Sequence, residues 1–68
     1  MTWIDSLEQA HIFPVGGRVF ELTNYRRPFQ IYGIDLTYEM LLVQFIDDHS
    51  QMMVSRALWE AGWRELKA

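Results

Sequence analysis

The sequence predicts a small α+β domain with the order α-β-β-α-α, in which a two-stranded antiparallel hairpin packs on two or three helices. Two features favour this fold class: a long apolar run in the middle of the chain, and a pair of strand-like segments just before it. The chain has 68 residues, of which half are hydrophobic and 15% are aromatic. That length corresponds to a single compact domain, residues 1–68, which buries only about 60% of the surface of its unfolded chain.

The apolar run Leu36–Ile46 is expected to form a helix on which the rest of the chain packs. Asp35 is an acceptable N-cap, and Glu39 falls in the first turn, where a negative charge suits the helix dipole. At about 100° per residue, one broad face of this helix is apolar. It consists of Tyr38, Leu41, Leu42, Phe45 and Ile46. The opposite face also carries apolar residues, Met40 and Val43, so another element or a partner has to cover it.

The first helix is predicted to begin at Thr2. Thr2 followed by Asp5 approximates a capping box, and Pro14 disfavours helical geometry at the residue before it. We therefore expect this helix to end near His11, before a flexible turn at Gly16-Gly17.

Arg18–Thr23 and Pro28–Ile34 are predicted to form the two strands of the hairpin, joined by a four-residue loop over 24–27. This register places two apolar pairs on one face of the hairpin. The pairs are Leu22 with Phe29 and Phe20 with Ile31.

The last helix is expected over Gln51–Ala61. Ser50 is a good N-cap, and Gly62 suits the left-handed residue that follows many helix C-termini. The tail, Arg64–Ala68, is compatible with a further helical turn, a short strand or a frayed end.

Periodicity alone does not distinguish a short apolar strand from a helix. An alternative interpretation therefore treats 40–46 as a strand and joins it to 52–58 as a hairpin across Asp47–Gln51.

The sequence contains no recognisable catalytic or cofactor motif. It has no cysteine, so a disulfide framework and a thiolate metal site are excluded. Asp47, Asp48 and His49 are potential metal ligands in a row, but only His11 adds a second imidazole, and we interpret them as a solvated turn. We accordingly predict no enzyme activity, no cofactor and no metal.

The distribution of charge and of tryptophan favours binding to another protein. The formal net charge is −3. Residues 1–34 balance three acids with three bases, whereas residues 35–68 carry six acids and three bases. Three tryptophans are many for so small a core, and tryptophan and methionine are enriched at interfaces. The predicted partner-binding residues are Asp35, Glu39, Met40, Val43, Asp47, Asp48, Met52, Trp59 and Trp63.

The leading functional hypothesis is a non-enzymatic protein-interaction module: a small inhibitor or accessory protein of the kind carried by phages and mobile elements. It would occupy a surface on a larger partner, and its acids could compete for a basic nucleic-acid-binding groove. The alternative is a small nucleic-acid-binding domain that uses the basic and aromatic residues of the hairpin. Those residues are Arg18, Tyr25, Arg26 and Arg27.

Small domains without disulfides often gain stability by association, so a homodimer is a further prediction. No run of about 18 apolar residues occurs, and the first residues include acids but no basic segment, so we expect neither a membrane helix nor a signal peptide. The expected location is the cytoplasm.

Overall fold

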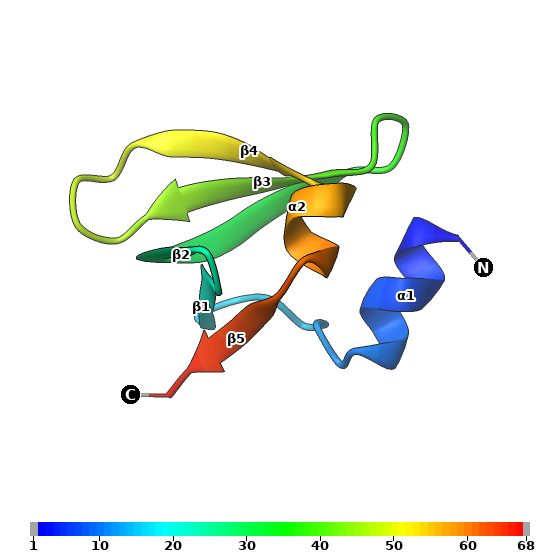
Figure 1. Cartoon of the computed structure of the whole chain (residues 1–68), viewed down its shortest axis with the longest axis horizontal. Helices are drawn as coiled ribbons and strands as arrows, with labels where there is room; N and C mark the ends of the chain where they lie inside the picture. The colour runs from blue at the N-terminus through cyan, green and yellow to red at the C-terminus, as the bar shows by residue number, and fades with distance from the viewer. Residues whose placement is uncertain (1, 68) are drawn as a thin grey trace.

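A computed structural model describes residues 2–67, and these residues form one five-stranded antiparallel sheet with two short helices (Figure 1). The strand order is β4-β3-β2-β1-β5. The elements are α1 (Trp3–Gln9), β1 (Val19–Leu22), β2 (Tyr25–Asp35), β3 (Met40–Phe45), β4 (Gln51–Ser55), α2 (Arg56–Glu60) and β5 (Trp63–Leu66). The predicted α+β fold with the order α-β-β-α-α is therefore wrong, because strands replace the middle helix and the start of the last one.

Within the apolar run Leu36–Ile46, residues 36–39 form a turn and Met40–Phe45 form strand β3, so the run is not a helix. Its burial alternates along the strand, with Leu41, Val43 and Phe45 facing the core. β3 pairs antiparallel with both β2 and β4. The alternation was hidden in the sequence because the outward positions Met40 and Leu42 are apolar too. The alternative that joined 40–46 to 52–58 as a hairpin is confirmed for β3 and β4, but its second strand ends at Ser55, and residues 56–58 belong to α2.

The β1–β2 hairpin is confirmed, but its predicted register is wrong. Phe20 pairs with Phe29 and Leu22 with Tyr25, so the turn has two residues rather than four, and a bulge separates the pairs. The register differs from the prediction by an even number of residues, which leaves the same side chains on the same face. The bulge includes Pro28, which has no N–H to donate to a ladder.

β1 also pairs with β5, so the chain end returns to the middle of the fold. The β5 strand confirms one of three alternatives for the tail. Gly62 precedes it with φ +145°, and the Thr23 N–H donates to the Gly62 carbonyl over 3.0 Å. The β1–β2 turn is thus attached to the segment that leaves α2.

The two helices cover one face of the sheet. α1 begins with the predicted capping box, in which the Thr2 hydroxyl accepts from the Asp5 N–H and the Asp5 carboxylate accepts from the Thr2 N–H. α2 is one short helix capped by Ser55, whose hydroxyl accepts from the Leu58 N–H over 3.2 Å. The predicted cap at Ser50 is wrong, because residues 51–55 belong to β4.

The core lies between the helices and the inner face of the sheet. It combines three residues that precede β1 and one residue of α2 with the inward residues of β1, β2, β3 and β4. Its members are Trp3, Leu7, Ile12, Phe20, Leu22, Phe29, Ile31, Leu41, Val43, Phe45, Val54 and Trp59. The longer of the two helices among residues 2–67 has seven residues, far short of the length that crosses a membrane.

Candidate protein-interaction surface

The outer face of β2, β3 and β4 carries an uncovered apolar row. Gly33 pairs with Leu42, and Leu42 pairs with Met53 at the edge of the sheet. Met53 is 60% exposed, and Tyr32, next to Gly33, is 51% exposed. We call Gly33, Leu42 and Met53 the outer row. The core residues of both helices pack on the other face of the sheet, which leaves the outer row to solvent.

Gly33 leaves room for the Leu42 side chain in this row. A Cβ at this position would lie 3.0 Å from Cδ1 of Leu42, so the leucine side chain leans across the glycine backbone. Beside the outer row runs a second, polar row of three glutamines in register, Gln30, Gln44 and Gln51. Charged residues are depleted at the core of protein interfaces, and methionine and aromatic residues are enriched there.

The predicted acidic residues lie at the two ends of β3 rather than on one continuous surface. Asp35 is the last residue of β2 and Glu39 lies in the β2–β3 connection, whereas Asp47 and Asp48 are in the β3–β4 connection. Six residues of strand separate the two groups by roughly 20 Å. The acids therefore flank the outer row from both ends.

Each acidic end is partly neutralised by an arginine of the same chain. Arg27 forms ion pairs with Asp47 at 2.9 Å and Asp48 at 2.7 Å, and its guanidinium lies 3.9 Å from the centre of the Phe45 ring. At the other end, Arg56 pairs with Glu39 and Glu60. These internal partners reduce the negative potential that a basic partner would meet.

The ionisation of these groups follows from their hydrogen bonds. The Ser50 hydroxyl and backbone N–H, with Arg27, lower the pKa of Asp48 to about 2. The Arg27 guanidinium lowers the pKa of Asp47, and the hydrogen bonds that Arg56 donates to Glu60 and Glu39 raise the pKa of Arg56. Asp47, Asp48 and Arg56 are therefore charged at neutral pH.

The predicted partner-binding residues differ in their access to solvent. Val43 and Trp59 lie in the core, so their side chains are not available to a partner. Met52 packs against the core from β4 and Met40 is half-buried. The half-buried Trp63 stacks on Trp59, with ring centres 4.6 Å apart and planes 13° from parallel.

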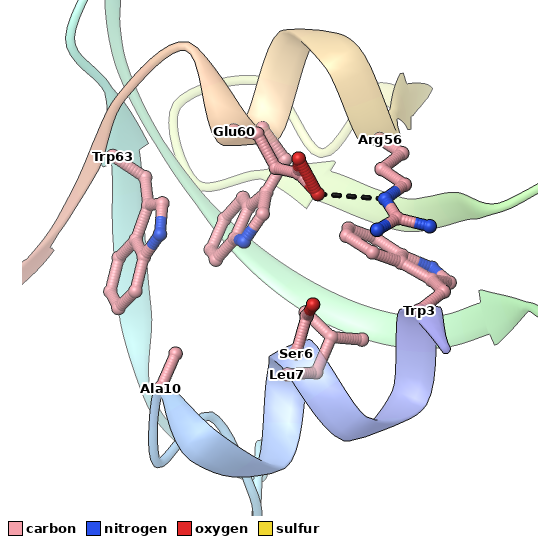
Figure 2. Close-up of a pocket in the computed structure, with 8 residues that line it drawn as sticks. Trp3, Ser6, Leu7, Ala10, Arg56, Glu60 and Trp63 are labelled. Atoms are coloured by element: carbon pink, nitrogen blue, oxygen red, sulfur yellow. Dashed lines mark hydrogen bonds and ion pairs between the residues drawn. The ribbon is translucent and has the colours of Figure 1, made fainter. Parts of the chain in front are cut away.

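A pocket of about 370 Å³ separates α1 from α2 (Figure 2). Figure 2 shows the indoles of Trp3 and Trp63 on either side of it, with Glu60 bonded to Arg56 at the rim. Arg56 also lies over the Trp3 ring, 5.6 Å from its centre. Trp3 and Trp59 contribute almost no accessible surface, so the tryptophans serve mainly to close the core here.

The four residues of the nucleic-acid alternative are not brought together as a free basic patch. Arg18 donates to both oxygens of Glu65 and to the carbonyls of Ile12 and Pro14, which fixes the loop before β1. Arg27 is held by the acids described above, and it donates to the Tyr25 hydroxyl. Within residues 2–67, Arg26 is the one arginine of this set without an ion pair.

The sequence reasoning did not include Tyr32, Leu42 and Met53 among the partner-binding residues. Leu42 was assigned to the apolar face of the predicted middle helix, and Met53 fell within the predicted last helix. The strand alternative for 40–46 contained the needed signal, because it places Leu42 on the face opposite Leu41 and Val43. Among residues 2–67, no group of three potential ligands is close enough to hold a metal ion.

No protein-family model, curated protein or solved structure matches this chain. The geometry of the described residues is therefore the basis for the proposals below.

Proposed function

We propose that the protein is a non-enzymatic protein-interaction module that acts as a small inhibitor or accessory protein on a larger partner. The observation that carries the proposal is the outer row, with Met53 and Tyr32 exposed beside a row of glutamines. Truncation of exposed apolar and aromatic anchors at the centre of an interface is what costs most binding energy.

The apolar row supports this function better than the acids do. Asp47 and Asp48 are paired with Arg27, and Glu39 is paired with Arg56. The partner we propose accordingly presents an apolar surface, and the acids at the ends of β3 contribute to orientation and association rate.

The test compares two exposed apolar residues on different faces. Met53→Glu alters the outer row, while Leu58→Glu on α2 is the matched control, since Leu58 is 41% exposed. The immobilised wild-type chain captures proteins from the native source, and the purified partner is then titrated against each variant. We expect Met53→Glu to weaken binding roughly 30-fold or more, with Leu58→Glu within about 2-fold of wild type.

An equal loss for both variants, or no loss for Met53→Glu, would contradict the assignment of the outer row. Retention of nucleic acid with a steep salt dependence that Arg26→Ala removes would instead favour the nucleic-acid alternative.

A further inference from the structure

The outer edge of β4 carries unpaired backbone groups. No strand among residues 2–67 pairs with this edge. The Phe45 N–H donates to the Ser50 carbonyl over 2.8 Å, and the Arg56 N–H donates to the Glu39 carbonyl over 2.9 Å. These two bonds fix which backbone N–H groups of β4 point towards β3, because bonded and non-bonded pairs alternate along an antiparallel ladder. The N–H groups that point away from the sheet are those of Gln51, Met53 and Ser55.

The β4 edge lacks the features that discourage pairing with a strand of another chain. β4 contains no charged residue, no proline and no bulge against β3. The opposite edge, β5, carries Arg64 and Glu65. Charged residues, proline and bulges discourage pairing between edges, so of the two edges β4 is the one open to another strand.

We propose that β4 pairs antiparallel with β4 of a second copy of this chain, around a two-fold axis at Met53. Met53 is the middle residue of the five in β4, so this register gives the longest overlap. Met53 then exchanges two hydrogen bonds with Met53 of the second copy, and Gln51 lies opposite Ser55 of the second copy.

A second copy is the occupant that the edge itself favours. A two-fold axis at Met53 places each outward N–H group of β4 opposite an outward carbonyl of β4 in the second copy. Because β4 has no charged residue, no like charges meet across the pair. The same operation continues the outer row across the joint, from Leu42 through both Met53 side chains to Leu42 of the second copy. The dimer would therefore display two outer rows side by side in one sheet.

The dimer is expected to be weak and concentration-dependent. Five paired residues from each chain bury well below the ~1,000 Å² that stable interfaces exceed. The pairing uses the edge of β4 and leaves the outer face uncovered, so it does not depend on the proposed partner. A strictly monomeric chain that still binds its partner through the outer row would overturn this inference alone.

The test removes one outward N–H and leaves the ladder to β3 intact. Met53→Pro deletes the Met53 donor in both copies, while Met53→Ala is the matched control that keeps the N–H. Sedimentation equilibrium from about 10 μM to about 1 mM covers the range expected for a weak dimer. We expect Met53→Pro to raise the dimer dissociation constant roughly 10- to 100-fold relative to Met53→Ala.

Amide chemical shifts of wild-type protein provide a second readout. The shifts of Gln51, Met53 and Ser55 should change with concentration, while those of Met52 and Val54, which are bonded to β3, stay constant. If Met53→Pro does not fold, Gln51→Pro replaces it, since proline is tolerated at the first residue of a strand. A monomer at every concentration, or a dimer unaffected by the proline, would overturn the proposal.

Discussion

Gly62 offers a sharp test of how α2, β5 and the β1–β2 turn fit together. Its φ of +145° lies where residues with a Cβ are strained, and a Cβ there would lie 2.7 Å from Oγ1 and 3.1 Å from Cβ of Thr23. Gly62→Ala therefore adds a backbone strain of about 1–3 kcal/mol. Forcing apart two packed segments adds about 1–3 kcal/mol more.

The summed loss is large for a domain of this size. A chain of 68 residues has a free energy of unfolding of roughly 3–10 kcal/mol. A loss of about 2–6 kcal/mol corresponds to a fall in melting temperature of roughly 10 °C or more, measured by circular dichroism. The Gly62→Ala variant should also unfold at a lower urea concentration than the wild-type chain.

Two other glycines separate the effect of backbone strain from the effect of the close contact with Thr23. Gly17 has φ +75° but open space around its Cβ position, whereas Gly16 has open space and no positive φ. Gly17→Ala should cost about 1 kcal/mol from backbone strain alone, and Gly16→Ala should be neutral or slightly stabilising. If Gly62→Ala were as stable as Gly16→Ala, the packing of Gly62 against Thr23 would be refuted.

Two further predictions concern the ion pairs. Arg18→Gln removes the paired bonds to Glu65 and the bonds to the preceding loop, so its melting temperature should fall well below that of Arg26→Gln. Among residues 2–67 the Arg26 side chain makes no ion pair. Equal melting temperatures would contradict the role of Arg18. The Ser50 hydroxyl lowers the pKa of Asp48 from 3.8 to about 2, and Arg18 lowers the pKa of Glu65. Because both pKa values are lowered by folding, stability is full above the unfolded values and falls as the pH drops from about 4.5 towards 2. Asp48→Asn should make this acid dependence shallower, and an unchanged slope in thermal melts would count against the Ser50 and Arg27 contacts.

Local signals allowed parts of this fold to be predicted. The Thr2–Asp5 capping box identified α1, since both halves of the box lie within one turn. The shared apolar face of β1 and β2 was also predicted correctly, although the bulge near Pro28 shifted the register by an even number of residues. Gly62 was placed at the end of a helix, where its positive φ is found.

The middle of the chain could not be assigned from its own residues. Met40, Leu42 and Met53 are apolar although they face outward, so the two-residue period of β3 and β4 was masked. Ser50 and Ser55 are equally good caps by residue type, and only the pairing of residues 51–55 with β3 excludes the first. The surface prediction inherited this error, because a helix would have gathered acids that the strand separates.

The proposed surface depends most directly on Leu42 and Met53 being opposite each other across β3 and β4. They form a non-bonded pair in the antiparallel ladder, so their α-protons should be close enough for a strong nuclear Overhauser effect. The matching pair Gln44 and Gln51 should give a second one. The absence of both effects, together with helical contacts between residues three apart over 36–46, would contradict the sheet and the surface built on it.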